Sequence, residues 1–313
     1  DAAEKEGYDH FMLKEIHEQP KGISETLLRR INEDGSINLD GISMTKEDIE
    51  GFNKVYIVAC GTAYHAGLVG KAVIEKLARI PVEVEIASEF RYREPMLDEH
   101  TLVIVISQSG ETADTVAALR EAKKNGCKVM AITNVVGSAI ARESDYVIYI
   151  WAGPEISVAS TKAYTTMLIA EYLLGVYLAQ QKGMDNGALR AEILEGLQHL
   201  PDIAETMLTD AYLAQIQKAA ESYKDANDIF FIGRGLDWAI ALEGSLKLKE
   251  ISYIHAEAYA AGELKHGTLA LVTDETPVIA ICVQDATYDK IASNIKEVKA
   301  REANVLAIIN EGD

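Results

Sequence analysis

Three hydroxyl side chains and a glycine follow an apolar run in residues 103–112 (Val-Ile-Val-Ile-Ser-Gln-Ser-Gly-Glu-Thr). The apolar residues predict a buried strand, and a helix is expected from residue 111 to residue 124. Gly110 lets backbone N–H groups approach a ligand, and the helix N-terminus carries partial positive charge. Ser107, Ser109 and Thr112 add hydroxyl donors, so the turn predicts a phosphate site. It contains no Lys or Arg, which suits a phosphorylated molecule that must also leave. The alternative is that Ser109 only caps the helix.

A second hydroxyl-rich turn occupies residues 155–162 (Glu-Ile-Ser-Val-Ala-Ser-Thr-Lys), before a long helix expected over 161–181. Hydroxyls at such a turn can also donate to a ligand. The alternative is that Ser160 is an N-cap and nothing more.

The candidate acid and base lie in residues 243–267. Lys247 and Glu250 are three residues apart, so they share one face of a helix. Glu250 could act as a general base with Lys247 holding charge beside it, and the alternative is a surface salt bridge. His266 lies between Gly262 and Gly267, and a histidine can exchange a proton with a sugar ring oxygen near neutral pH. The alternative for His266 is a structural role.

Buried strands alternate with helical patterns through the first half of the chain. The expected strands are 55–60, 82–86, 102–107, 128–133 and 146–151. This alternation predicts an α/β fold with a parallel sheet covered on both faces, whose ligands lie beyond the carboxyl ends of the strands. The turns at Gly61 and Ser107 both follow strands, so both are expected at that edge.

The pattern restarts at residue 228, which indicates two copies of one α/β unit. A strand runs into Gly233 and Gly235, which we align with Gly61 and Ala63, and strands 277–283 and 304–309 flank a helix over 288–300. The second copy has Cys-Val-Gln-Asp-Ala at 282–286 where the first has its hydroxyl turn. The expected organisation is a helical arm over 1–50, which carries no chemistry of its own, a first domain over 51–185 and a second over 186–313.

The composition excludes several classes of protein. A net charge of −19 argues against nucleic acid and anionic membranes as partners. No run is apolar enough to span a membrane, and no signal peptide is present. Cys60, Cys127 and Cys282 are far apart and predict buried thiols in a reducing cytoplasm. The histidines show no metal-binding spacing, so neither a metal nor a redox cofactor is expected. Because the chain has no initiator Met, we expect it to be a fragment.

Four segments together resemble the isomerase part of the glucosamine-6-phosphate synthase family, over essentially the whole chain. They are residues 60–66 (Cys-Gly-Thr-Ala-Tyr-His-Ala), 107–112, 158–162 (Val-Ala-Ser-Thr-Lys) and 247–259 (Lys-Leu-Lys-Glu-Ile-Ser-Tyr-Ile-His-Ala-Glu-Ala-Tyr). The resemblance implies two tandem sugar-isomerase (SIS) domains. It also implies the conversion of fructose 6-phosphate and ammonia to glucosamine 6-phosphate, with glucose 6-phosphate as a related ligand.

The resemblance also implies a role for each matching residue. Glu250 is similar to the base that moves a proton between C1 and C2, Lys247 to its helper, and His266 to a ring-opening histidine that the neighbouring subunit of a homodimer supplies. The residues that resemble the substrate contacts are Ser107, Gln108, Ser109 and Thr112 for the phosphate, and Gly61, Thr62, Val158 and Ser160 for the sugar.

The chain departs from the family pattern in four places. Ala63 stands where the family usually has Ser, so one hydroxyl contact is lost, and Thr268 replaces a usual Pro. The family's C-terminal tail, which supplies a Lys to the open-chain sugar, has no counterpart up to Asp313. The N-terminal glutaminase domain with its cysteine nucleophile is also missing from the expected organisation.

Two other functions fit the same residues. One is a stand-alone SIS aldose–ketose isomerase or sugar-amine deaminase, which needs no glutaminase domain. The other is a non-catalytic sugar-phosphate sensor, which would keep residues 107–112 and have no use for Glu250 or His266. Fold alone does not decide between them.

Overall fold

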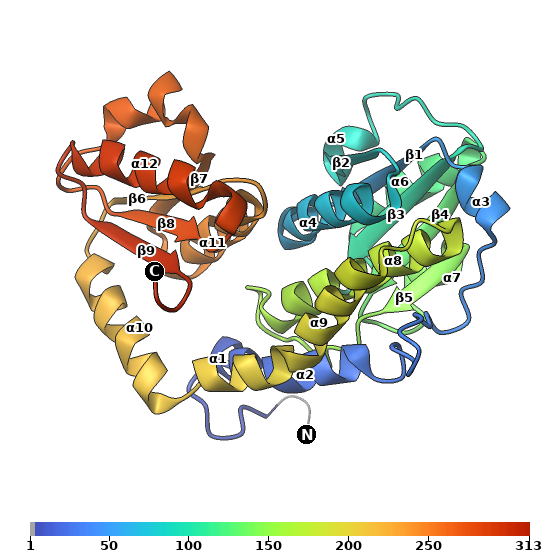
Figure 1. The fold of residues 1–313 in the computed structure, drawn as a ribbon, viewed down its shortest axis with the longest axis horizontal. Coiled ribbons are helices and arrows are strands. Elements are labelled where there is room, and N and C mark those ends of the chain that lie inside the picture. The colour runs from blue at the N-terminus through green and yellow to red at the C-terminus, as the bar shows by residue number, and fades with distance from the viewer. Residues whose placement is uncertain (1–3) are drawn as a thin grey trace. The chain divides into compact units, whose positions relative to one another are not determined.

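The computed structural model describes residues 4–313, and the chain divides into two compact units between Met207 and Leu208. The first unit contains a parallel sheet with the strand order β2-β1-β3-β4-β5 (Figure 1). The strands are β1 (Lys54–Ala59), β2 (Val82–Ile86), β3 (Thr101–Ser107), β4 (Lys128–Thr133) and β5 (Tyr146–Tyr149). This confirms the predicted α/β fold. The last strand is shorter than expected, and the backbone beyond it turns at Trp151, whose φ is +49°.

Nine helices of the first unit lie among residues 4–207. They are α1 (Phe11–His17), α2 (Gln19–Leu27), α3 (Lys46–Glu50), α4 (Gly61–Ala78), α5 (Ala87–Phe90), α6 (Ala113–Lys124), α7 (Ala139–Glu143), α8 (Lys162–Lys182) and α9 (Gly187–Met207). No helix in the described part of the chain is both long and apolar enough to cross a bilayer.

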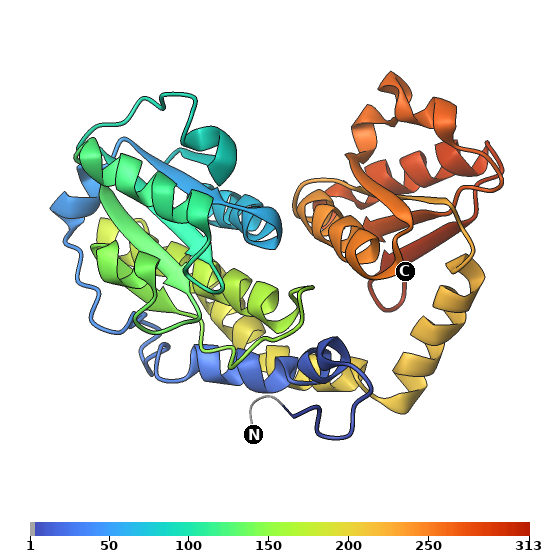
Figure 2. The ribbon, with the colours of Figure 1, turned by 180° about the vertical axis from the view of Figure 1, so that it is seen from behind.

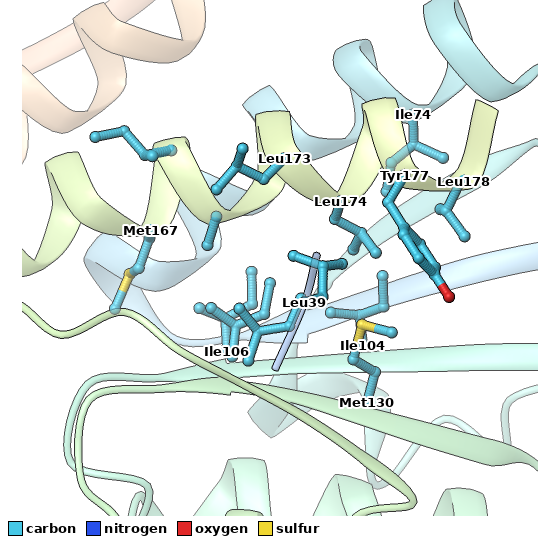
Figure 3. Packing of buried hydrophobic residues seen from close by; sticks show 14 of the residues in the cluster. Leu39, Ile74, Ile104, Ile106, Met130, Met167, Leu173, Leu174, Tyr177 and Leu178 are labelled. Carbon is cyan, nitrogen blue, oxygen red and sulfur yellow. The ribbon is translucent and has the colours of Figure 1, made fainter. Parts of the chain in front are cut away.

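Successive side chains of each central strand point to opposite faces, and each face has its own core. On β3, Ile104 and Ile106 join the core beneath α4 and α8, while Val103 and Val105 join the core beneath α6. Figure 3 shows side chains of α8, among them Leu174, directed toward strand β3, which carries Ile104 and Ile106. Figure 2 shows α6 on the opposite face of the same sheet. Burial on both faces explains why β3 reads as a continuous apolar run.

The second unit repeats this arrangement on a smaller scale. Its parallel sheet has the order β7-β6-β8-β9, and α11 and α12 cover opposite faces (Figures 1 and 2). The strands are β6 (Asp228–Gly233), β7 (His255–Ala260), β8 (Val278–Cys282) and β9 (Val305–Ile309). The helices are α10 (Asp210–Tyr223), α11 (Leu236–Ser252) and α12 (Tyr288–Lys299), with short 3₁₀ turns η1 (Ala261–His266), η2 (Thr268–Leu271) and η3 (Asp285–Thr287). The two strand orders are the same when β6 is taken as the counterpart of β1, so the prediction of two copies of one unit is confirmed.

Two details of the expected organisation differ from the structure. The units divide between Met207 and Leu208 and not at residue 186, because α9 buries Leu194 and Leu197 in the core of the first unit. The alignment of Gly61 with Gly233 was wrong by two residues. Gly61 and Gly235 each stand at the start of the helix that follows the first strand of the unit, with φ of +56° and +58°, so Gly61 corresponds to Gly235.

Candidate functional site

The hydroxyl turn after β3 is held by its own side chains. The backbone N–H of Gly110 donates to Ser107 Oγ at 3.0 Å, and Ser107 Oγ lies 3.0 Å from Thr112 Oγ1. The N–H of Glu111 donates to Ser109 Oγ at 3.2 Å. Helix α6 begins at Ala113 with Thr112 at its N-cap, so the alternative that Ser109 caps this helix is wrong. Ser109 is exposed and can donate its hydroxyl to a ligand.

Gly110 has to be a glycine in this turn. Its φ is +68°, and a Cβ at this position would overlap the hydroxyl of Ser138. The turn is also tied to the next strand, because Asn134 N–H donates to the carbonyl of Gln108 at 3.1 Å. The close approach to Ser138 therefore fixes where Ser109 and the first turn of α6 lie.

The second hydroxyl turn, residues 155–161, folds back on a carboxylate. Glu155 Oε2 accepts hydrogen bonds from the N–H groups of Thr161 at 3.1 Å and Ala163 at 2.9 Å. Glu155 therefore satisfies the start of α8, and the alternative that Ser160 caps this helix is wrong. The Ser160 hydroxyl is buried with no hydrogen-bond partner among residues 4–313, which leaves it able to bond a ligand. Val158 is 96% exposed at the tip of the turn.

The two turns line one cavity of about 220 Å³ at the carboxyl edge of the first sheet. Its lining includes every substrate residue predicted from the sequence except Gly61, whose neighbours Cys60 and Thr62 take part. The predicted residues are Thr62, Ser107, Gln108, Ser109, Thr112, Val158 and Ser160. The cavity is hydroxyl-rich and also borders Glu155, so it can hold an anion by neutral donors at one end and a polyol at the other.

A larger hollow of about 840 Å³ shares Gln108, Ser109 and Glu155 with this cavity. Its remaining walls carry charges of both signs, including Glu18 and Lys21. The hydroxyl side chains of both turns line the smaller cavity, which is therefore the better candidate for a site that binds its ligand through hydroxyl groups.

The predicted acid–base residues lie on α11 in the second unit. Lys247 Nζ contacts the carboxylate of Glu250 three residues on, and lies 3.6 Å from Glu243 Oε1 four residues back. The three charges share one face of the helix, as the spacing predicted for Lys247 and Glu250. The Glu250 side chain is 32% exposed, so its carboxylate can reach a ligand at the surface of this unit.

His266 ends the 3₁₀ turn η1 and is exposed. Gly267 follows it with φ of +143°, a conformation that favours glycine. His255, on β7 of the same unit, has two carboxylate neighbours and lies 2.6 Å from Asp228 and 3.3 Å from Glu257. Hydrogen bonds to Asp228 and then to Glu257 raise the pKa of His255 above its ordinary value.

The sequence interpretation missed three glutamates that support these sites. Glu15 accepts hydrogen bonds from the backbone of the second turn, Glu155 closes that turn, and Glu243 flanks Lys247. The four-residue spacing of Glu243 and Lys247 was a usable signal. The sequence held no such signal for Glu15, because Glu15 is distant in sequence from residues 156 and 157, which it contacts.

Within residues 4–313 no group of three or more His, Cys, Asp or Glu side chains is arranged to hold a metal. The cysteines are unpaired thiols, and Cys127 and Cys282 are buried as predicted. Cys60 is only partly buried, because it leaves β1 at the edge where the cavity opens. Burial, and then Asp98, raise the pKa of Cys127 to about 11.

Three comparisons place the chain among known proteins. Glutamine–fructose-6-phosphate aminotransferase [isomerizing] of Clostridium tetani is 62% identical over 313 residues, which are 100% of this chain and 51% of that protein. The protein of the same name from Caldanaerobacter subterraneus is 60% identical over the same shares. The chain therefore spans about half the length of these curated relatives.

A solved structure gives the same result. The C-terminal domain of glucosamine-fructose-6-phosphate aminotransferase from Francisella tularensis matches with a TM-score of 0.92 and 45% identity, over 99% of this chain and 86% of that one. The family model described as "SIS domain" matches residues 49–177 and 222–313, one stretch in each unit. The chain belongs to the SIS domain family, and it matches the isomerase portion of glutamine–fructose-6-phosphate aminotransferases.

Proposed function

We propose that this chain is the sugar-phosphate isomerase portion of a glucosamine-6-phosphate synthase. Fructose 6-phosphate is the substrate, ammonia released from glutamine is the nitrogen donor, and glucosamine 6-phosphate is the product. The observation that carries the proposal is that the hydroxyls of two separate turns line one cavity at the carboxyl edge of the first sheet. The names of the relatives support the choice of substrate.

The first unit binds the phosphosugar in this proposal. Ser107, Gln108, Ser109 and Thr112 hold the phosphate, assisted by the positive end of α6. Thr62, Val158 and Ser160 contact the sugar, and the unpartnered hydroxyl of Ser160 accounts for one of those contacts. Gly61 lets the chain turn into α4 beside them.

The second unit supplies the proton transfer. Ammonia condenses with the ketone at C2 of the open-chain sugar, and water leaves. Glu250 then takes a proton from C1 to give an enolamine and returns it to C2, while C1 becomes the aldehyde of glucosamine 6-phosphate. Lys247, held between Glu243 and Glu250, offsets the charge that changes at the base. His266 opens the sugar ring from the neighbouring subunit of a homodimer, and the protein works in the cytoplasm.

Calorimetry with fructose 6-phosphate and with fructose tests the binding step. The intact chain should bind the phosphorylated sugar much more tightly than fructose. Ser109→Ala should weaken only the phosphorylated sugar, by about 10-fold, since hydrogen bonds to a charged group contribute about 1.5–3 kcal/mol. Ser222→Ala, at an exposed serine on α10, is the matched control. Equal affinity for both sugars, or no effect of Ser109→Ala, would refute the phosphate site.

A sugar-phosphate sensor would give the same binding results. The presence of both Glu250 and His266 favours an enzyme over a sensor, because a sensor has no use for a base. Incubation of fructose 6-phosphate with the chain in deuterated water separates the two functions. An enzyme introduces deuterium at C1, visible by NMR, and a sensor leaves the sugar unchanged.

A further inference from the structure

Three polar side chains at the junction of α1 and α2 contact the turn 155–161 and the start of α8. Glu15 Oε1 accepts hydrogen bonds from the N–H groups of Ile156 at 2.7 Å and Ser157 at 3.1 Å. Glu18 Oε2 accepts one from Lys162 Nζ at 2.5 Å. Gln19 Oε1 accepts one from the hydroxyl of Thr165 at 2.6 Å. The helical arm, for which the sequence predicted no functional role, therefore binds the chain on both sides of the tip of the turn at Val158.

Glu15 is the most deeply buried of these three arm residues. Its side chain is almost completely buried, with 2% of the residue exposed, and its Oε2 has no hydrogen-bond partner among residues 4–313. A buried carboxylate is unfavourable unless donors compensate it, and the two backbone N–H groups of Ile156 and Ser157 donate to Glu15. The backbone at 156 and 157 cannot move away without leaving that charge uncompensated, so the turn is held in one conformation.

Lys162 provides the second anchor. Only 2% of Lys162 is exposed, and its ammonium forms an ion pair with Glu18 at 2.5 Å. Breaking a buried ion pair by removing one partner is costly, because the other charge is left buried. The start of α8 is therefore fixed to the arm, as are residues 156 and 157.

Between the two anchors lie Val158 and Ser160, which line the 220 Å³ cavity opposite the phosphate turn. The arm (α1 and α2) holds residues 156 and 157 on one side of Ser160 and Lys162 on the other. The position of Ser160 relative to Ser109 therefore depends on these contacts. We propose that Glu15 and Glu18 are positioning residues for the phosphosugar cavity, and that their carboxylates set the affinity for the sugar through turn 155–161. This inference rests on the proposed function, since the ligand is fructose 6-phosphate.

Thr26 gives a matched control within the same arm. Its hydroxyl donates to the carbonyl of Ile150, and the residue is fully buried. Thr26→Val removes a buried contact between α2 and the rest of the unit without touching residues 155–162. Loss of stability alone should therefore appear in both Thr26→Val and Glu15→Gln, whereas a change in sugar affinity should appear only in the latter.

The experiment compares the whole chain with Glu15→Gln, Glu18→Gln and Thr26→Val. Hydrogen exchange read by NMR at Ile156 and Ser157 should quicken by about 10-fold or more in Glu15→Gln, because a charge-assisted bond is replaced by a weaker neutral one. Fructose 6-phosphate affinity should fall by about 5–20-fold in both glutamate variants, because displaced contacts lose their alignment. Thr26→Val should lower the melting temperature and keep the affinity within about twofold.

Unchanged exchange at Ile156 and Ser157 in Glu15→Gln would overturn the proposal, as would an equal loss of affinity in Thr26→Val. If Glu15→Gln does not fold, Glu18→Gln carries the same affinity test. If the unsubstituted chain does not bind fructose 6-phosphate, the proposed function fails, and the exchange rates still decide whether Glu15 holds the turn.

Discussion

One pair of matching positions shows how the carboxyl edges of the two sheets differ. Gly61 and Gly235 both stand, with positive φ, at the start of the helix that follows the first strand of their unit, and two residues later stand Ala63 and Asp237. Ala63 lines the 220 Å³ cavity of the first unit. Asp237 is 1% exposed, and its Oδ2 accepts a hydrogen bond from the N–H of Val283 just after β8, at 3.1 Å. The second unit thus directs its own carboxylate to the strand end where the first has a hollow.

The two units share a topology but fill this edge differently. In the second unit, the backbone N–H that follows β8 donates to Asp237, whose pKa is raised by burial. In the first unit, the small Ala63 leaves the matching edge open to the cavity, where we propose that the phosphate binds. A ligand site therefore depends on which side chains stand at the edge, and the fold alone does not create it.

Placing a carboxylate in the first unit should have the largest effect. Ala63→Asp should weaken fructose 6-phosphate binding by about 100-fold or more, since like charges brought together cost several kcal/mol. The melting temperature is measured as well, because Ala63 is buried beside the cavity and a carboxylate there lowers stability. Calorimetry checks the affinity, and Ala63→Ser, which adds a hydroxyl without charge, is the control. Wild-type affinity in Ala63→Asp would mean that the cavity is not the phosphate site.

Gly110→Ala tests the close approach that the second unit lacks. The variant combines a positive φ with overlap against Ser138, so the free energy of unfolding should fall by about 2–4 kcal/mol. Gly137→Ala is the matched control, because Gly137 also has positive φ (+73°) but a Cβ there meets nothing within 4 Å. Gly137→Ala should lower the free energy of unfolding by about 1–2 kcal/mol. Equal losses in urea unfolding would show that backbone strain, and not the contact with Ser138, constrains the turn.

Glu171 is a buried carboxyl of the first unit that lies away from the edge. It sits in α8 against Gly70 of α4, both of its oxygens lack a hydrogen-bond partner among residues 4–313, and burial raises its pKa well above 4.5. The folded chain therefore binds more protons than the unfolded chain above pH 4.5, so stability falls as pH rises toward the folded pKa. Glu171→Leu should flatten this fall and raise the melting temperature at pH 8, by about 2–4 °C per kcal/mol gained. A melting temperature with the same pH dependence as the unsubstituted chain would contradict this.

The smallest effect is expected from the cysteines at the two edges. Cys60 lines the cavity of the first unit, whereas Cys282 is buried at the end of β8 and burial raises its pKa. Iodoacetamide should modify Cys60 before Cys282 or Cys127, because alkylation needs an accessible thiolate. Fructose 6-phosphate should slow the modification of Cys60 by about 3–10-fold, measured by mass spectrometry, since it covers a thiol in its own site. Faster modification of Cys282 would refute the contrast between the edges.

Much of the fold followed from local patterns. The buried strand that ends at Ser107 and the helix that follows it were predicted within one or two residues, because a strand covered on both faces is apolar throughout and Gly110 marks the turn into the helix. Strand β7 was missed. Its sequence, His-Ala-Glu-Ala-Tyr-Ala, alternates small and charged residues, and only its pairing with β6 makes it extended.

The candidate site was predictable only in part. Ser107, Ser109 and Thr112 are contiguous with a glycine, so their chemistry was visible in one turn. The contribution of Glu15 depends on a contact across 141 residues, and the role of Asp237 depends on a correct match between the two units. The sequence alignment was two residues out of register, so it placed Gly235 opposite Ala63 and hid that comparison.

The central claim is that the first unit binds the phosphosugar and the second moves its proton. Deuterium incorporation at C1 of fructose 6-phosphate, followed by NMR alongside calorimetric affinity, tests it in Glu250→Gln and Ser109→Ala. Glu250→Gln should bind the sugar as tightly as the unsubstituted chain and show no exchange. Ser109→Ala should bind more weakly, by about 10-fold, and still exchange when saturated. Undiminished exchange in Glu250→Gln would contradict the account.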